Sequence, residues 1–498
     1  MNASPAAAPA AADTGLKFPD LLIYRGYAAP VRIEADVYDL EVEGCIPEQL
    51  NGAYYRLSAD TQYPPRLGQD IFINGDGMVH MLRLEHGHAD LKTRYVRTPK
   101  FLAERAARRA LFGAYRNPFT DEASVAGVDG NTANTSAFWH HGQLYALKEA
   151  ARPVRLDPLS LATLGSWDFN GRLASKTFTA HPKIDPVSGE VIAFSYNTRG
   201  VADRTVQIHW ISPGGELTRT ESFEVPYSFM AHDSLVSAHY IAFTVYPMIS
   251  DWARVQRGEP YFHWDSSQPT MVAIIPRQQG VAGIRWYPCP FTGMQTHSFN
   301  AWEEGAVLHL DHFFSASGWL SQFPDIRGLA TREEPPHAER WSFDLSSSAE
   351  TFSVRRIFEQ IGEMPMIDPR FLMRRARHFY FGTHNPKLGP MLEWGPKGPP
   401  FTCIGHFDEG RQQLKFWYAG ADSAPEEPCF IPRSADAPEA EGWILSLVGR
   451  RAEHRTDLVI LDAQHIEQGP LATIRIPCRL HEGFHGVWVP HTQLPLPP

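Results

Sequence analysis

One pattern recurs along the chain: an apolar run ends in Asp, a small polar turn follows, and a second alternating run comes after the turn. The clearest examples are centred on Asp157, Asp185, Asp344 and Asp462. Asp, Pro, Ser and Gly supply the backbone geometry of tight turns, so each example predicts a β-hairpin. Hairpins that repeat without helical crossovers predict an antiparallel all-β fold, and both a propeller and a large sandwich would satisfy this pattern.

The 498 residues could form two or three ordinary domains, but all-β barrels and propellers can run long as single units. We expect one domain over residues 16–498, after a disordered Ala/Pro-rich tail at residues 1–15 that lacks the features of a secretion signal. No stretch approaches the roughly 18 uninterrupted apolar residues of a membrane-spanning helix. The net charge of −10 argues against nucleic acid as a partner. Five scattered cysteines without a C-x-x-C pair predict a reduced, cytoplasmic protein.

One segment predicts a helix. Residues 99–119 are bounded by prolines and rich in Ala, Leu, Glu and Arg, which are good helix formers. Arg105, Arg108 and Arg109 would give this helix a basic face beside apolar side chains. We expect a solvated helix without stable membrane association, and peripheral membrane contact is the alternative.

Four histidines lie far apart in the sequence, and each sits in a short apolar, strand-like run beside a tight turn: His181, His232, His297 and His485. Neutral imidazole is the commonest metal-ligating side chain, and a buried imidazole needs a partner for each ring nitrogen. Taken singly, each of them fits a structural role, because the chain holds 22 histidines. Taken together, they suggest a metal held by nitrogen ligands alone.

A rival metal motif overlaps the last of these runs. Residues 481–485 match the H-E-x-x-H pattern of zinc metalloproteases, which works only on a helix. Here the segment follows a strand-like run, carries Gly483 at its centre and leads into a β-rich end. We therefore expect a chance match, with His481 in a loop.

The surroundings of two histidines carry a resemblance to a known family. His297 is followed by Asn300, Ala301, Trp302 and two glutamates, and His485 by Gly486 and Trp488. These segments resemble the carotenoid cleavage oxygenase family, and further matching motifs follow in order at residues 74–84, 147–158, 363–371 and 426–433. The resemblance implies a seven-bladed β-propeller, with a metal on its axis and a dome of helices and loops above it. It also suggests a homodimer.

Carried over residue by residue, the resemblance implies that the four histidines bind Fe(II). It also implies that three outer carboxylates accept hydrogen bonds from three of the imidazoles: Glu149, Glu363 and Glu427. Such partners fix the tautomer and orientation of a metal-bound imidazole. The family usually has Gly where this chain has Glu426, which leaves open whether Glu426 or Glu427 faces inward.

The stretch from residue 103 to residue 150 is most similar to bacterial lignostilbene dioxygenases. In that subfamily a Tyr and a Lys contact the 4-hydroxyl of a stilbene, and the matching positions here are Tyr115 and Lys148. Deprotonating a para-phenol pushes electron density into the central double bond, and a buried lysine has a lowered pKa that suits it to accept the proton. A solvent-facing Lys148 with Tyr115 in the core is the alternative.

Lys148 and Glu149 are adjacent, and successive strand residues point to opposite faces. The two side chains can both face the metal only if the strand ends or bulges there; otherwise Lys148 reaches the substrate from another side.

The sequence thus predicts a non-haem Fe(II) dioxygenase that uses O2 to split the central C=C bond of a 4-hydroxystilbene into two aromatic aldehydes. A carotenoid- or apocarotenoid-cleaving enzyme is one alternative, and for it Lys148 would be irrelevant. A non-enzymatic propeller that serves as an interaction scaffold is another, because a fold alone does not fix function.

Overall fold

The computed structural model describes residues 16–317, 334–393, 395, 398 and 400–496, so the expected disordered tail at residues 1–15 lies outside the described residues. Strands dominate this part of the chain, which confirms the all-β prediction. Its α-helices are α1 (Pro99–Ala107) and α2 (Trp252–Gln256). Short 3-10 turns lie at Leu22–Tyr24, Gly26–Ala28, Phe72–Asn74, Pro118–Thr120, Ala123–Val125, Gly280–Gly283, Pro369–Phe371, Ile466–Gln468 and His491–Gln493. No helix in these ranges is long and apolar enough to cross a bilayer.

Four sheets each contain four strands that pair antiparallel in chain order. The first is β10 (Lys183–Ile184), β11 (Val191–Tyr196), β12 (Thr205–Ile211) and β13 (Leu217–Glu224). The second is β14 (Leu235–Val236), β15 (Tyr240–Val245), β18 (Met271–Pro276) and β19 (Arg285–Pro288), with a separate ribbon of β16 (Met248–Ser250) and β17 (Phe262–Trp264). The third is β20 (Met294–Glu304), β21 (Val307–Ser315), β22 (His337–Asp344) and β23 (Ser353–Ile361). The fourth is β24 (Glu363–Met366), β25 (His378–Thr383), β26 (Cys403–Asp408) and β27 (Gln413–Tyr418).

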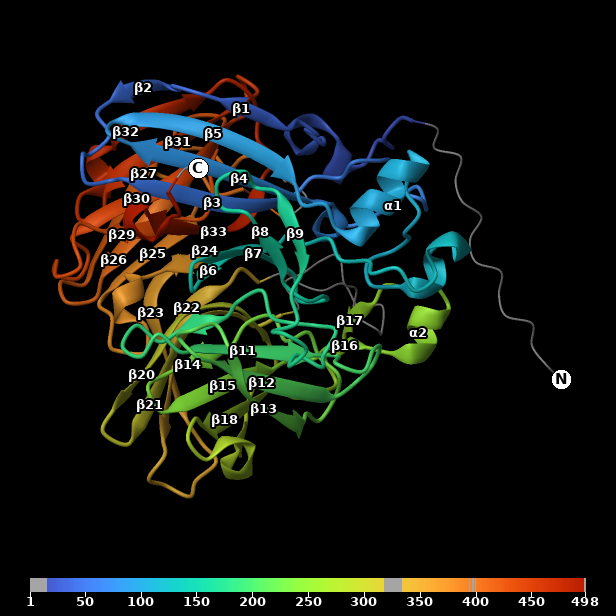
Figure 1. Cartoon of the computed structure of the whole chain (residues 1–498). Coiled ribbons are helices and arrows are strands. Elements are labelled where there is room, and N and C mark those ends of the chain that lie inside the picture. Colours follow the sequence, from blue (N-terminus) through green and yellow to red (C-terminus); the bar gives the residue numbers. More distant parts are fainter. Residues whose placement is uncertain (1–15, 318–333, 394, 396–397, 399, 497–498) are drawn as a thin grey trace.

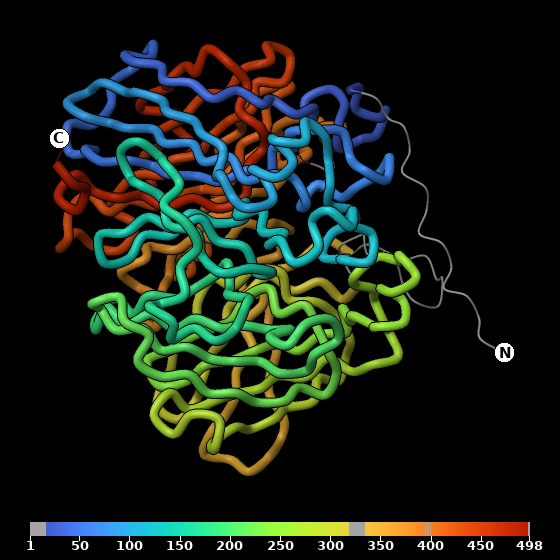
Figure 2. The backbone as a smooth tube through the Cα atoms, turned by 45° about the vertical axis from the view of Figure 1, so that its right-hand side comes forward, coloured from blue at the N-terminus to red at the C-terminus, as the bar shows by residue number. Residues whose placement is uncertain are grey.

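Two larger sheets join the beginning of the chain to its end, where blue and red segments lie side by side in Figures 1 and 2. One runs in the order β1 (Ala35–Val37), β5 (His88–Tyr95), β4 (Gly77–Glu85), β3 (Gly52–Ala59), β33 (Gly483–Pro490), β6 (Ser136–His140), β7 (Gln143–Leu147), β8 (Val154–Leu156) and β9 (Thr163–Ser166). The other runs in the order β2 (Glu41–Gly44), β32 (Pro470–Ile476), β31 (Arg455–Asp462), β30 (Gly442–Arg450) and β28 (Ser423–Pro425), and β29 (Cys429–Pro432) also pairs with β30.

The nine-stranded sheet has a natural division. Its β33 and β6 are parallel and meet through one bridge, between His485 and Ser136. Dividing the sheet there leaves seven antiparallel units of four or more strands among the described residues. Pairing of the first and last segments of the chain closes such an arrangement into a β-propeller. The count of seven blades stays a prediction, because it depends on this division.

All four predicted hairpins are present, as the antiparallel pairs β8–β9, β10–β11, β22–β23 and β31–β32. In each turn the Asp carboxylate accepts a hydrogen bond from the backbone N–H two residues further on. The four pairs are Asp157 with Leu159, Asp185 with Val187, Asp344 with Ser346 and Asp462 with Gln464, at 2.9 to 3.1 Å. This is the local bond that makes Asp a turn-former.

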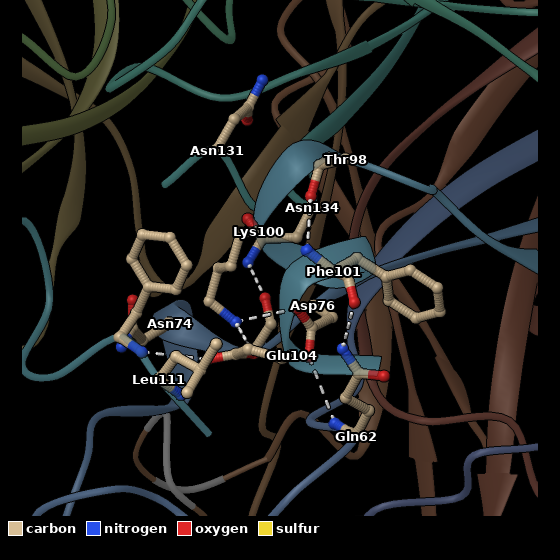
Figure 3. A network of polar contacts seen from close by, with 12 residues as sticks. Gln62, Asn74, Asp76, Thr98, Lys100, Phe101, Glu104, Leu111, Asn131 and Asn134 are labelled. Carbon is tan, nitrogen blue, oxygen red and sulfur yellow. Dashed lines mark hydrogen bonds and ion pairs between the residues drawn. The ribbon is translucent and has the colours of Figure 1, made fainter. Parts of the chain in front are cut away.

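The predicted helix over residues 99–119 is much shorter than expected. Helix α1 ends where Arg108 adopts a left-handed conformation, with φ of 56°. The buried carboxylate of Glu104 then accepts hydrogen bonds from the backbone N–H groups of Leu111 and Phe112, at 2.9 and 3.1 Å. These bonds give the two backbone amides a partner outside a helix, so tertiary hydrogen bonds outweigh the helix propensity of this segment. Figure 3 shows Glu104 between Leu111 and Lys100.

The segment after α1 packs against α2 beside the strands, and both helices lie on the right in Figure 1. The side-chain amide of Asn117 donates to the carbonyl oxygen of Val255 at 2.8 Å. The rings of Phe119 and Trp252 meet edge to face, with their centroids 5.4 Å apart. These elements correspond to the predicted dome.

Apolar side chains fill the spaces between neighbouring sheets. One cluster joins Leu235 and Ile274 of the β14–β19 sheet to Leu308 and Trp341 of the β20–β23 sheet. The core is therefore divided among the interfaces between sheets.

Candidate metal centre

The structure brings the four predicted histidines together from four separate parts of the chain. His181 lies just before β10, His232 lies three residues before β14, His297 lies in β20, and His485 lies in β33. Strands β10, β14 and β20 are each the first edge strand of a sheet. Since these edges converge, histidines that are far apart in sequence meet in space.

Ring contacts define one cluster. The centroid of the His181 ring lies 4.7 Å from His232, 5.1 Å from His297 and 4.5 Å from His485. The His297 ring lies 4.7 Å from His232 and 4.9 Å from His485. Ring nitrogens of His181, His232 and His297 lie within 4.8 Å of one another, and His485 joins them through its ring contacts.

Three of the imidazoles are held from behind by buried carboxylates. Nδ1 of His232 donates to Glu149 at 2.7 Å, Nδ1 of His297 donates to Glu363 at 2.6 Å, and Nδ1 of His485 donates to Glu427 at 2.7 Å. Among the described residues, His181 is the member of the cluster without a carboxylate partner; its backbone N–H donates to Oγ1 of Thr179 at 2.9 Å.

Glu426, the alternative to Glu427 as the inward-facing glutamate, has a different partner. Glu426 forms an ion pair with the buried guanidinium of Arg56, whereas Glu427 accepts from both His485 and the backbone N–H of Gly486. Glu427 is thus the one of the two that contacts the cluster.

The proton positions in this cluster fit a bound cation. An ionised carboxylate only accepts hydrogen bonds, so Nδ1 of His232 and Nδ1 of His297 each carry a proton. In the neutral rings the two Nε2 atoms then present lone pairs to each other, and they lie 2.9 Å apart. Nε2 of His181 is also buried and has no hydrogen-bond partner in the described part of the chain. A cation among these nitrogens would satisfy all three.

A cavity opens onto this cluster. Its wall includes the three carboxylate-bound histidines, their glutamates, and mainly apolar side chains, among them Phe72, Ile73, Met230, Met294, Phe401 and Phe484. The polar exception of interest is Lys148, which is buried and lies on the same wall. A mainly apolar chamber with a few placed polar groups is typical of a site for a small organic ligand.

Lys148 and Glu149 both face the cavity because strand β7 ends at Leu147, just before them. Nζ of Lys148 donates to the carbonyl oxygen of Ile73 at 3.0 Å and to Oδ1 of Asn134 at 3.1 Å. Burial lowers the pKa of Lys148 to about 8, although the nearby charge of Glu149 opposes this shift. Lys148 is therefore not solvent-facing.

Tyr115 lies beside Lys148, on the side of a neighbouring cavity. The ammonium nitrogen sits 5.2 Å from the centroid of the buried Tyr115 ring, a cation–π distance. Tyr115 lines a neighbouring polar cavity, and Lys148 lines both cavities. Burial raises the pKa of the Tyr115 hydroxyl, so this group stays protonated at neutral pH.

The H-E-x-x-H segment is not helical. Residues 481 and 482 precede β33, which begins at Gly483. Nε2 of His481 contacts the carbonyl oxygen of Ala28 at 3.1 Å, so His481 fixes the N-terminal segment rather than joining the cluster. The prediction of a chance match is confirmed.

Sequence reasoning missed two groups of residues beside the cluster. Asn134 and the carbonyl of Ile73 orient Lys148, and Lys183 and Asp233 form an ion pair behind the histidines. The sequence did carry a signal for the ion pair, because Lys183 and Asp233 are charged residues that closely follow predicted ligand histidines in otherwise apolar runs.

Comparison with known proteins agrees with this geometry. The family model described as retinal pigment epithelial membrane protein, RPE65, matches residues 28–490. The chain therefore belongs to this family, which includes the carotenoid cleavage oxygenases.

Individual relatives cover nearly the full length. Lignostilbene-alpha,beta-dioxygenase isozyme III of Sphingomonas paucimobilis is 40% identical over 96% of this chain and 99% of its own. Isoeugenol monooxygenase of Pseudomonas nitroreducens is 38% identical over 93% and 97%, and resveratrol cleavage oxygenase 1 of Aspergillus fumigatus is 36% identical over 95% and 96%.

Solved structures show the same fold. The lignostilbene dioxygenase of Pseudomonas brassicacearum superposes with a TM-score of 0.91 at 37% identity, over 96% of this chain and all of that one. Cobalt-substituted apocarotenoid oxygenase of Synechocystis superposes with a TM-score of 0.79 at 26% identity, over 93% and 97%.

Proposed function

We propose that this protein is a non-haem Fe(II) dioxygenase that cleaves the central C=C bond of a 4-hydroxystilbene, so that the alkene and O2 give two aromatic aldehydes. The observation that carries the proposal is the placement of Lys148 on the wall of the apolar cavity that contains the imidazole cluster. Relatives named for lignostilbene and resveratrol, at 40% and 36% identity, support this substrate class.

His181, His232, His297 and His485 would hold the metal. Imidazole suits Fe(II), and a cobalt-substituted enzyme of the same fold supports a metal in this protein. Ferrous iron bound there would supply the activation of O2. The glutamates behind three of the rings would fix their orientation and offset the charge of the ion, since no carboxylate in the described part of the chain belongs to the ring cluster itself.

Lys148 and Tyr115 would anchor the phenol. A lysine with a pKa of about 8 exists partly as the neutral amine near neutral pH, and the amine accepts the phenolic proton. The phenolate oxygen then donates electron density through the ring to the central double bond, which makes the alkene easier to oxidise. The Tyr115 ring keeps the ammonium in place after the transfer through its cation–π contact.

Anaerobic loading with ferrous iron followed by product analysis tests the proposal. A panel of trans-resveratrol, an isorhapontigenin-like stilbene and an apocarotenal separates the substrate classes, and two aldehydes per stilbene are expected. His297→Ala should bind no iron and form no product. A purified protein without stoichiometric iron after loading would favour the scaffold alternative.

Isoeugenol is a second candidate substrate. Two relatives at 38% and 37% identity are named for it. Isoeugenol is a 4-hydroxyphenyl propene, so the same lysine could anchor its phenol. Adding isoeugenol to the panel decides between the two, because the proposal expects stilbenes to have the higher kcat/KM.

Two further properties belong to the proposal. Five free cysteines support a reduced, cytoplasmic location. The expected homodimer is tested by the mass of the purified protein in solution.

A further inference from the structure

Three side chains behind the imidazole cluster form a connected polar group. Lys183 follows His181 by two residues, Asp233 follows His232 directly, and Ser298 follows His297 directly. Nζ of Lys183 pairs with Oδ1 of Asp233 at 2.8 Å and donates to Oγ of Ser298 at 3.1 Å. Three segments that carry histidines, and that belong to three consecutive sheets, are therefore tied to one another.

The Asp233 carboxylate is the centre of this group. Its side chain is 1% exposed, against 17% for Lys183. Oδ1 accepts from Lys183 and from the backbone N–H of Ser234 at 2.7 Å. Oδ2 accepts from the backbone N–H and the hydroxyl of Ser298, at 2.9 and 2.6 Å. All of its roughly four acceptor positions are used, so this carboxylate is fixed in orientation.

His181 is the histidine that most needs such support. Each of the other three has a carboxylate on Nδ1, whereas His181 has none among the described residues. Lys183 is the charged side chain nearest to His181 in sequence. Its partner Asp233 connects it to the segments of His232 and His297, whose rings lie 4.7 and 5.1 Å from the His181 ring.

We propose that Lys183, Asp233 and Ser298 form a clamp that holds the segments of His181, His232 and His297 at metal-binding distance, and that it takes the place of the carboxylate partner His181 lacks. This inference rests on the proposed function, because it assumes that the cluster holds iron. The three are positioning residues, since none of them contacts the imidazole rings or the cavity. Residues that hold ligands in place raise metal affinity by removing alternative arrangements.

Asp233→Asn tests the clamp. Asn keeps the size and one acceptor oxygen, but it loses the charge that pairs with Lys183. The full-length protein, loaded with Fe(II) without oxygen, is transferred into excess ferrous chelator, and the rate of iron release is measured. Release is expected to be faster by about 10- to 100-fold, the usual effect of losing an outer partner.

A matched control separates positioning from general stability. Asp457 is also 1% exposed and pairs at 2.7 Å with Arg450, which is 16% exposed, on strands β30 and β31. Asp457→Asn should lower the unfolding temperature of the protein without changing iron release. The clamp is overturned if Asp233→Asn releases iron no faster than Asp457→Asn does.

Two further variants keep the test decisive. Ser298→Ala removes a single hydroxyl, so the protein should fold, and iron release should still accelerate. Lys183→Met combined with Asp233→Asn removes both charges, so unfolding temperature should recover while release stays fast. Parental iron retention in the double variant would overturn the proposal. A parental protein that binds no iron would instead overturn the proposed function itself.

Discussion

Lys148 and Asn134 are joined by a 3.1 Å hydrogen bond from Nζ to Oδ1. Each of the two side chains also donates to a backbone carbonyl. The Asn134 NH2 group donates to the carbonyl oxygens of Ile73 and Gly75, at 3.0 and 2.7 Å. The Ile73 carbonyl is also the second acceptor for Lys148. Among the described residues, two of the three N–H donors of the ammonium thus have an acceptor, so the third can donate to a ligand.

Lys148→Met should leave iron binding intact and strongly reduce cleavage of hydroxylated stilbenes. Positioned proton transfer contributes about 10²- to 10⁴-fold, so kcat/KM for trans-resveratrol should fall within that range. A stilbene without a 4-hydroxyl serves as a comparison substrate, and any cleavage of it should be unchanged, since it has no phenolic proton to give. The exposed Lys176, which lines only the polar cavity, supplies the control variant Lys176→Met. Equal rates for Lys148→Met and the parental enzyme on resveratrol would remove the assigned role.

The rate on 4-hydroxystilbenes should rise with pH through a pKa of about 8. Burial lowers the pKa of Lys148 to that value, and only the neutral amine accepts the phenolic proton. Below this pH the lysine is charged and the rate falls; above it the neutral form predominates and the rate levels off. A profile of kcat/KM against pH measures this, and the step should vanish in Lys148→Met. A profile that falls as pH rises through this region would contradict the proton transfer.

Asn134→Ala should loosen Lys148 as well as destabilise the protein. The buried carbonyl of Gly75 would lose this donor and the carbonyl of Ile73 would keep only Lys148, at a cost of about 1 to 3 kcal/mol in the free energy of unfolding. Asn131 is a matched control, because it is also buried and its amide donates to the carbonyl of Arg152 rather than to a hydrogen-bond partner of Lys148. Urea unfolding and turnover of resveratrol measured together should show similar stability losses and a selective loss of activity in Asn134→Ala. Equal activities in the two variants would make Asn134 a purely structural residue.

The sequence predicted the convergence of distant histidines better than it predicted local structure around them. The hairpins at Asp157 and Asp344 could be predicted because the Asp side chain bonds to its own turn, which is a local interaction. The length of α1 could not be predicted, because Glu104 ends it by binding the amides of Leu111 and Phe112 in a buried tertiary network.

The orientation of Lys148 and Glu149 was open for a similar reason. Strand alternation predicts opposite faces, and only the end of β7 at Leu147 lets both side chains reach one cavity. Strand ends are set by pairing across the sheet, which a single sequence does not show. The ion pair of Lys183 with Asp233 was missed because its partners lie 50 residues apart, one in β10 and the other just before β14 of the next sheet.

The network in Figure 3 predicts a large effect on stability. Lys100 is buried and its ammonium pairs with Asp76 at 2.9 Å and with Glu104 at 2.8 Å. Lys100→Met should cost about 3 to 5 kcal/mol in the free energy of unfolding, because it leaves two buried carboxylates without their cation. Replacing exposed Arg109, whose partner is Glu122, should cost far less. Urea unfolding of the two variants measures the difference, and equal losses would show that the Lys100 network is not needed for stability.

Glu149→Gln should weaken iron binding while leaving the cavity shape unchanged. Gln keeps an oxygen that accepts from Nδ1 of His232, but it removes the charge that raises the basicity of that ring. The apparent affinity for Fe(II), measured by anaerobic competition with a chelator, should fall by about 10- to 100-fold. Glu426→Gln is the control, because Glu426 lies on the same cavity wall but pairs with Arg56 and not with a histidine. The two variants should differ clearly in iron affinity, and an equal affinity in both would mean that the carboxylate behind His232 does not tune the metal site.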